Sequence, residues 1–227
     1  MNKSLPYVEL GFPNGPPVLL LSGFPDSELS AWGEVIPEQL AKTHRCIFVC
    51  LPGYSAKSNY DVNVPWGYEQ EDVLEMLRNT MDAVGLTHTK FVMIAHDWGA
   101  YYALLHLTRH PNSVSKLVLC DIGMCSAFSL PLTSLPFIAF YQLFFAITYF
   151  ISQAISVRLA ESLFQAIGIR AFFQILSPNR RHRSNVENQL TVLKCYPYYY
   201  LWRRLLTGTT LPQAFPTCPL LFMVSTV

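Results

Sequence analysis

Charged residues are scarce in this sequence. They make up 14% of its 227 residues, against about 25% in an ordinary soluble domain. The two signs nearly cancel, because 16 Lys and Arg face 15 Asp and Glu, and the formal net charge is +1. A chain without a basic excess has no general attraction for a polyanion, so we expect no nucleic-acid partner. Hydrophobic residues make up 51% of the chain, which excludes an intrinsically disordered protein.

The sequence also lacks a metal-binding cysteine spacing and a secretory leader. Six cysteines are scattered along the chain, and Cys46 and Cys50 have no second ligand pair downstream. We therefore expect no metal site and no cofactor. The first residues, MNKSLPYVELG, contain no apolar stretch of the kind that a signal peptide needs. We expect a cytoplasmic chain that is not secreted and keeps its thiols reduced, with membrane association left open.

Short apolar runs alternate with segments of helical periodicity over the first half of the chain. The predicted strands are 7–10, 18–21, 45–51, 90–95 and 116–120, and the predicted helices are 30–42, 69–84 and 97–110. This alternation predicts an α/β protein with a mostly parallel sheet covered by helices on both faces.

The alternation stops between Gly123 and about Pro212, where the chain is aromatic and helical in character. A further buried strand is predicted at 219–224. We therefore predict a core made of residues 1–122 and 213–227, interrupted by a helical insertion at 123–212.

The segment FVMIAHDWGAYYALL is the most informative part of the sequence. A buried strand runs into a sharp turn with small residues at Ala95 and Gly99, and a helix follows at once, as in the nucleophile elbow of hydrolases. The central residue is Asp97 in place of the usual serine. A carboxylate there suits attack on an sp³ carbon and formation of an ester that water then hydrolyses. The alternative is that Asp97 only N-caps the helix, since Asp is a preferred N-cap residue.

A second motif, LLLSGFPDS at 19–27, favours the catalytic interpretation. In elbow hydrolases the loop after this strand supplies one backbone N–H of the oxyanion hole, and the residue after the nucleophile supplies the other. The predicted donors are the amides of Phe24 and Trp98.

With these motifs in their order, the chain resembles the α/β-hydrolase family and its epoxide hydrolase-like branch, which is related to haloalkane dehalogenases. The residues that carry the resemblance are SGFPDS at 22–27, LPGYSAKS at 51–58 and HDWG at 96–99. The resemblance implies an eight-stranded sheet with a helical cap inserted after the sixth strand. It also implies a hydrophobic small-molecule substrate, an epoxide that Asp97 opens.

The sequence departs from the family pattern in several places. Ser22 stands where the family usually has His, and Leu51 where it usually has Asp. The family's acid and histidine follow the strand that resembles 219–224, but no histidine follows His182 here. We therefore expect the last strand and helix to be missing, turnover to fail, and the chain to be a fragment or short isoform. Asp121 is either a substitute acid or a loop-capping carboxylate.

The resemblance also implies tyrosines in the insertion that donate a hydrogen bond to the epoxide oxygen. The run CYPYYYLW at 195–202 resembles the segment that carries one of them. Tyr199 is the first candidate, with Tyr198 and Tyr200 close behind, and Tyr141 is a weaker candidate for the second tyrosine. The alternative is that these rings only pack the insertion.

Residues 122–157 contain no charged side chain, and 137–155 is long enough to span a bilayer. A crossing would separate strands that must join one sheet, so we favour a cap helix or a helix lying in the membrane surface.

Three functions remain open from the sequence. The first is epoxide opening. The second is haloalkane dehalogenation, with the Trp98 indole N–H holding the departing halide. The third is an inactive chain that binds a hydrophobic ligand or partner. The identity of the substrate and the oligomeric state do not follow from the sequence.

Overall fold

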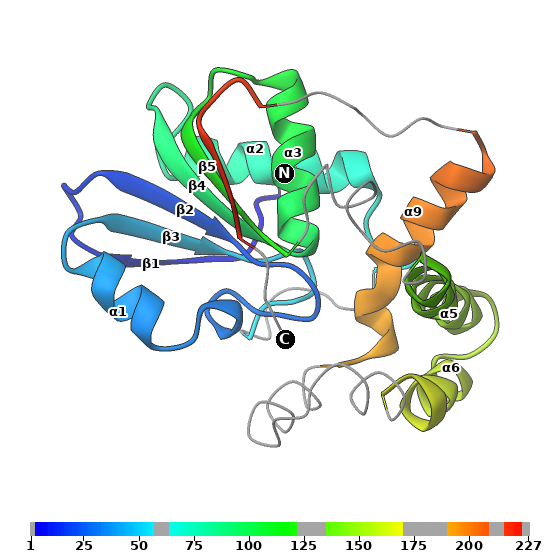
Figure 1. Ribbon diagram of the computed structural model, residues 1–227. Helices are drawn as coiled ribbons and strands as arrows, with labels where there is room; N and C mark the ends of the chain where they lie inside the picture. Colours follow the sequence, from blue (N-terminus) through cyan, green and yellow to red (C-terminus); the bar gives the residue numbers. More distant parts are fainter. Residues whose placement is uncertain (1–2, 57–63, 122–134, 170–189, 209–215, 224–227) are drawn as a thin grey trace. The chain divides into compact units, whose positions relative to one another are not determined.

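A computed structural model describes residues 3–56, 64–121, 135–169, 190–208 and 216–223 (Figure 1). The chain divides into two compact units. The sheet unit consists of residues 1–61, 71–126 and 212–227, and the helical unit of residues 62–70 and 127–211. We describe each unit by itself.

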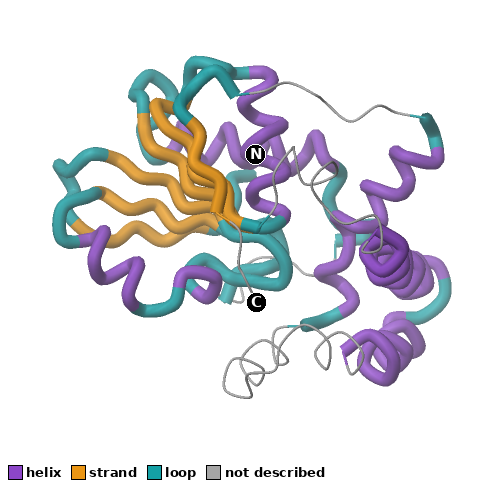
Figure 2. Tube along the Cα trace, viewed as in Figure 1, coloured by secondary structure: helices purple, strands orange, loops and turns teal. Residues whose placement is uncertain are grey.

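The sheet unit is built on six described strands, drawn in orange in Figure 2. Their order is β1-β3-β2-β4-β5-β6. The strands are β1 (Tyr7–Gly11), β2 (Pro17–Leu21), β3 (Arg45–Val49), β4 (Phe91–His96), β5 (Val114–Cys120) and β6 (Leu220–Met223). Only β1 is antiparallel to its neighbour, and the other pairs are parallel. The α/β class and the α/β-hydrolase fold with a mostly parallel sheet are confirmed, with six of the eight strands that the resemblance implied.

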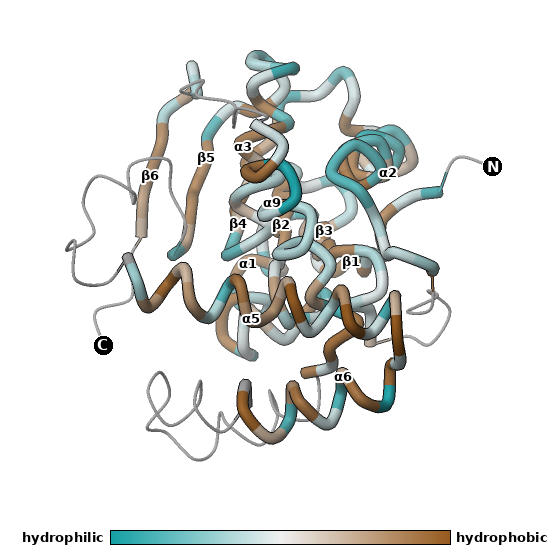
Figure 3. The backbone as a smooth tube through the Cα atoms, turned by 90° about the vertical axis from the view of Figure 1, so that its right-hand side faces the viewer, coloured by the Kyte–Doolittle hydropathy of each residue, from teal (hydrophilic) through white to brown (hydrophobic). Residues whose placement is uncertain are grey.

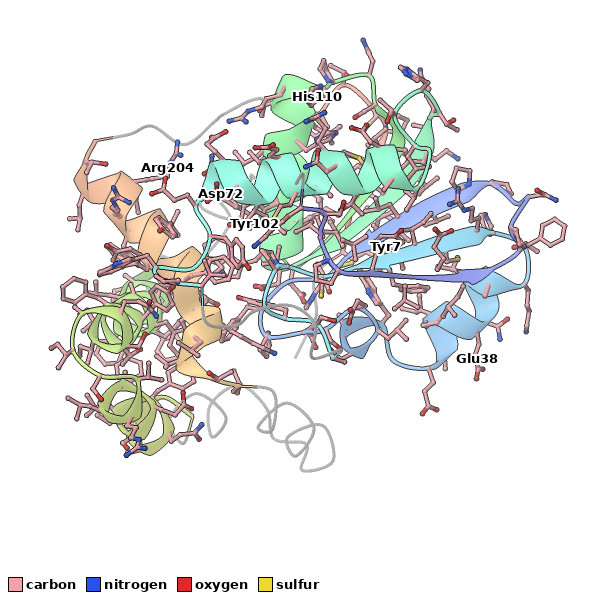
Figure 4. All side chains as sticks on the ribbon, turned by 180° about the vertical axis from the view of Figure 1, so that it is seen from behind. Tyr7, Glu38, Asp72, Tyr102, His110 and Arg204 are labelled. Atoms are coloured by element: carbon pink, nitrogen blue, oxygen red, sulfur yellow. The ribbon has the colours of Figure 1, made fainter. Side chains whose placement is uncertain are left out.

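The central strand β2 is apolar throughout because both of its faces are covered. On β2, Val18 and Leu20 pack with Trp32 in one cluster, whereas Leu19 and Leu21 are fully buried on the other face. Helix α1 (Val35–Ala41) lies on one side of the sheet, and α2 (Gln70–Ala83) and α3 (Trp98–Arg109) lie on the other (Figure 1). The buried Tyr102 of α3 and His110, which follows its last turn, are labelled in Figure 4.

One predicted helix is interrupted. Residues 30–42 form a short 3₁₀ turn, η1 (Ser30–Trp32), and then α1. Gly33 separates them with a φ of +62°, a conformation that ends a right-handed helix and that glycine adopts without strain. The prediction of one continuous helix was therefore wrong at this point.

The prediction of a buried strand at 219–224 also needs correction. Strand β6 forms parallel to β5, but all four of its residues are exposed, with Leu221 57% and Met223 53% accessible. The reason is its place at the edge of the described sheet, where only β5 pairs with it. Val224 lies outside the described residues.

The described part of the insertion is helical, as predicted. It contains α5 (Leu135–Ala154), α6 (Val157–Leu163), a π-helical turn η2 (Phe164–Ile169), a 3₁₀ turn η3 (Val192–Cys195) and α9 (Tyr196–Leu206). Residues 122–134, 170–189 and 209–215 of the predicted insertion lie outside the described residues. The buried rings of Phe145, Tyr149, Phe164 and Tyr196 form the centre of the unit.

The helical unit also holds a segment that the sequence analysis assigned to the core. Residues 62–70, between β3 and α2, group with the insertion. The N–H of Trp66 donates to Gln153 Oε1 at 2.9 Å, and the hydroxyl of Tyr200 donates to the Trp66 carbonyl at 2.9 Å. Gly67 follows with a φ of +64°, and a Cβ there would lie 2.5 Å from the Tyr149 hydroxyl. Backbone contacts of this kind are not visible in hydrophobic periodicity.

Replacing Gly99 by Ala should strongly destabilise the sheet unit. A Cβ at this position would lie 2.3 Å from the Leu21 carbonyl oxygen, which is a backbone atom of β2 that cannot move alone. We expect a loss of about 3 kcal/mol in the free energy of unfolding, at the upper end of ordinary overpacking costs. The control is Gly85→Ala, where no atom lies within 4 Å and the positive φ alone should cost about 1 kcal/mol. Equal urea midpoints for the two variants would contradict the close contact between α3 and β2.

Candidate active site

The turn between β4 and α3 holds Asp97 in an unusual backbone conformation. Its φ is +52°, a value that side-chain-bearing residues rarely adopt. The turn is tight because α3 starts directly at Trp98 and Gly99 lies against the Leu21 carbonyl. Strain of this kind persists only where the surroundings impose it, and it is concentrated at functional sites. The geometry is that of a nucleophile elbow with a carboxylate at its tip.

The carboxylate of Asp97 makes no N-capping hydrogen bond to α3. Its Oδ2 instead accepts a hydrogen bond from the backbone N–H of Phe24, in the loop after β2, at 2.7 Å. The backbone N–H of Trp98 also hydrogen-bonds to it. Trp98 is the first residue of the helix, whereas an N-cap side chain accepts from the second or third N–H. The structure thus brings Asp97, Phe24 and Trp98 together, and Asp97 does not act as an N-cap.

Burial dominates the protonation of Asp97. The side chain is withdrawn from water, which raises its pKa from 3.8 to about 6, although the N–H groups of Trp98 and Phe24 and the charge of His96 act in the opposite direction. The carboxylate is therefore ionised at neutral pH but poorly solvated. An anion with few water molecules to remove is suited to attack on an electrophilic carbon.

His96, next to the candidate nucleophile, forms an ion pair that the sequence analysis did not predict. Its Nε2 lies 2.9 Å from Asp121 Oδ2. Burial favours the neutral ring, but the hydrogen bond to Asp121 and the negative charges of Asp97, Asp26 and Asp121 outweigh it and raise the pKa of His96. Of the two sequence interpretations of Asp121, this contact supports neither directly. His96 ends β4 and Asp121 directly follows β5, but only the pairing of these two parallel strands brings them together.

Buried polar contacts fix the two loops that follow β2 and β3. Ser22, at the position where the resemblance implied His, donates its hydroxyl to the carbonyls of Ser27 at 3.0 Å and Val49 at 3.1 Å. The buried carboxylate of Glu28 accepts from the Ser55 hydroxyl at 2.5 Å. Leu51, at the second unusual position, is fully buried. These contacts position Phe24 without the family's usual side chains.

The candidate tyrosines lie in the helical unit. Tyr199 packs against Trp66 at 5.7 Å and Phe150 at 6.4 Å between ring centroids, and its hydroxyl has no hydrogen-bond partner among the described residues. The hydroxyl of Tyr200, by contrast, is bound to the Trp66 carbonyl. The ring of Tyr141 packs edge-on against Tyr198 at 6.3 Å.

The part of the chain that the structure describes contains no group of three or more His, Cys, Asp or Glu side chains placed to hold a metal ion.

This combination of elbow, oxyanion loop and parallel sheet has a counterpart among known proteins. The family model for the alpha/beta hydrolase fold matches residues 16–154. The chain belongs to the α/β-hydrolase fold family. Epoxide hydrolase 2 of Caenorhabditis elegans is 29% identical over 128 residues, which are 56% of this chain and 34% of that protein. Epoxide hydrolase 3 of Mus musculus is 26% identical over 210 residues, which are 90% of this chain and 52% of that protein.

Within the family the chain is therefore epoxide hydrolase-like, and it spans about half the length of these relatives or less. Solved structures agree on the fold. A mutant of an epoxide hydrolase from Bacillus megaterium matches with a TM-score of 0.64 and 18% identity, over 97% of this chain and 78% of that one. A laboratory-evolved variant of potato epoxide hydrolase matches with a TM-score of 0.64 and 20% identity, over 96% and 76%.

Replacing Asp97 by Asn should stabilise the hydrolase at alkaline pH. Because the pKa of Asp97 in the folded state, about 6, lies above its usual 3.8, the carboxyl favours folding only while it is protonated. That contribution is lost as the pH rises through about 6. The neutral amide avoids the cost of a buried charge, which a shift of this size puts at about 3 kcal/mol.

The measurement is the urea midpoint of unfolding between pH 4 and pH 8, chosen to bracket the shifted pKa near 6. The advantage of Asp97→Asn should be present at the alkaline end and shrink toward the acid end. Glu75→Gln, which removes an exposed carboxylate from α2, is the matched control and should change little. A wild type more stable than Asp97→Asn at the alkaline end would show that the site stabilises the anion.

Proposed function

We propose that the chain carries the epoxide-opening site of an epoxide hydrolase-like enzyme, with Asp97 as the nucleophile. The observation that carries the proposal is the hydrogen bond from the Phe24 N–H to Asp97 Oδ2. It leaves Oδ1 as the attacking oxygen and holds Oδ2 in place. In the reaction, Oδ1 bonds to an epoxide carbon, the C–O bond of the ring breaks, and the epoxide oxygen takes a proton to become a hydroxyl.

The same hydrogen bond suits the second step, which is hydrolysis of the ester by water. When water attacks the ester, the oxygen that becomes negatively charged is Oδ2 of Asp97 itself. The N–H of Phe24 already donates to this oxygen, and the N–H of Trp98 donates to the same carboxylate, so both groups are positioned to serve as an oxyanion hole for the nucleophile's own carbonyl. A serine hydrolase needs the corresponding donors beside the substrate's carbonyl instead.

We further propose Tyr199 as the proton donor to the opening epoxide, with Tyr141 as a second donor. A phenol stays protonated near pH 7 and can donate a hydrogen bond to a developing alkoxide. The unengaged hydroxyl of Tyr199 supports its choice over Tyr200, whose hydroxyl is occupied.

Hydrolysis of the ester needs a base that activates water. Among the described histidines, His96 lies beside Asp97 in sequence, but its Nε2 is engaged by Asp121 and its Nδ1 is buried away from solvent. The resemblance puts the base after β6, where this sequence has no histidine. We therefore propose that the 227-residue chain forms the ester and does not turn it over.

Haloalkane dehalogenation is the second candidate, because the same carboxylate displaces a halide by the same attack. The Trp98 indole would hold the halide, and no proton is required. A ligand-binding role without chemistry is the third.

Incubation of the chain with an aromatic terminal epoxide such as styrene oxide should add the full mass of the epoxide to the peptide that contains Asp97. The rate should rise with pH through about 6, because only the ionised carboxylate attacks. Intact-protein and peptide mass spectrometry measure both, and Asp97→Asn is the control that cannot react. If the epoxide modifies the chain but not Asp97, then Asp97 is not the nucleophile. If the chain forms diol catalytically, it does not lack the base that hydrolyses the ester.

Tyr199→Phe separates the epoxide and dehalogenase functions. Loss of the phenol should slow alkylation of Asp97 by the epoxide at least about tenfold, since general acid catalysis commonly contributes that much or more. Alkylation by a haloalkane, with release of halide, should be unchanged. Tyr198→Phe is the matched control from the same helix. A haloalkane that reacts faster than any epoxide, with no effect of Tyr199→Phe on either, would favour dehalogenation.

A further inference from the structure

Helix α5 is apolar on its exposed face, where a helix on the surface of a soluble protein is usually polar. Its buried face carries Phe145, Ala146 and Tyr149 together with the hydroxyls of Thr148 and Ser152, which are 2% and 5% exposed. Its exposed face carries large apolar side chains from Phe140 to Phe150. These are Phe140, Leu143, Ile147 and Phe150, exposed by 67%, 40%, 49% and 45%. We call these four residues the α5 stripe.

The arrangement is held in place by contacts within the helical unit. The buried hydroxyls of Thr148 and Ser152 donate to carbonyls of α5 itself, at 2.9 and 2.6 Å, so that burying them leaves no donor unsatisfied. The same face packs on α9 and α6, with Phe145 and Tyr149 almost fully buried. Figure 3 shows hydrophobic residues along most of α5. The α5 stripe is therefore not free to rotate into the unit.

Continuous exposure of this kind marks an interaction surface. One helix among the described residues, Pro136–Ala154, is long and apolar enough to cross a membrane, and only 28% of its most apolar window is buried. Crossing would break its contacts with α6 and α9. A helix that keeps one face on its own unit and exposes an apolar stripe fits the plane of a membrane surface.

The charge of the two units identifies the kind of surface. Residues 62–70 and 127–211 carry eight Lys and Arg against three Asp and Glu, a formal charge of +5. The remaining residues carry eight against twelve, a formal charge of −4. The helical unit is therefore basic, although the net charge of the whole chain is close to zero. Among the described cations of this unit, Arg203 is paired with Glu69 and Lys194 is buried. Arg158 of α6 is exposed, and Arg204 lies toward the end of α9 (Figure 4).

We propose that the helical unit docks on an anionic lipid bilayer, with the α5 stripe inserted at the level of the headgroups. Apolar insertion and attraction of basic side chains to anionic lipids then act together, and each alone gives weak binding. The proposal is independent of Asp97 chemistry. If the chain acts on apolar substrates, binding to the bilayer would bring it to the membrane in which those substrates dissolve.

Flotation of the purified 227-residue chain with lipid vesicles tests this. The chain should bind vesicles of phosphatidylcholine and phosphatidylserine, bind phosphatidylcholine alone at least about tenfold more weakly, and dissociate as salt is raised. The double variant Phe140→Glu/Ile147→Glu should lose binding by more than about tenfold, since two apolar side chains that would enter the bilayer are replaced by charges.

The matched control is Phe12→Glu/Val35→Glu in the sheet unit. It makes the same charge change at apolar residues that are 55% and 69% exposed, and it should keep the binding of the wild type. Circular dichroism checks that both variants fold. Loss of binding in both double variants, or no binding of the wild type to either vesicle, would overturn the proposal. So would a dimer in light scattering that only the α5 double variant dissociates, because the stripe would then face a second copy.

Tryptophan fluorescence tests insertion without any substitution in α5, so it remains informative if the α5 double variant fails to fold. Trp66 is 38% exposed and its ring lies 5.9 Å from that of Phe150. Bromine-labelled lipids should quench tryptophan fluorescence in anionic vesicles, and Trp66→Phe should remove part of that quenching. Fluorescence that stays unquenched while the chain floats with the vesicles would contradict insertion of this face.

Discussion

The site depends on one hydrogen bond that joins two distant parts of the sequence, from the Phe24 N–H to the carboxylate of Asp97 at 2.7 Å. It requires the loop after β2 and the turn after β4 to meet at one edge of the sheet, which parallel pairing of these two strands provides. Much of the surrounding structure keeps that distance short. Gly23 and Gly99 have no side chains because backbone atoms lie 2.4 and 2.3 Å from where a Cβ would be.

Burial raises the pKa of this carboxylate and also makes its charge costly to the fold. A buried anion with a raised pKa destabilises the folded protein at a pH above that pKa. The His96–Asp121 ion pair lies beside it and adds a positive charge that favours ionisation of Asp97. If Asp97 is the nucleophile that we propose, the arrangement trades stability for reactivity, as catalytic groups commonly do.

The sequence predicted the α/β class, the order of strands and helices, and the turn at Asp97, because these follow from local apolar runs and small residues. It did not predict the interruption at Gly33 or the exposure of β6, since the first depends on backbone conformation and the second on the lack of a neighbour in the described sheet. The His96–Asp121 pair was missed because sequence spacing says little about contacts between strand ends. The roles of Phe24, Trp98, Tyr199 and Tyr141 remain predictions.

The helical unit is assembled from two separate pieces of chain, since residues 62–70 join it through the backbone of Trp66 and Gly67. This matters for protein engineering and for evolution by exchange of parts. A chimera that transplants only 127–211 onto another hydrolase core would leave the Gln153 and Tyr200 contacts without their partners. A working exchange has to move both pieces together, because the helical unit is not a single continuous insertion.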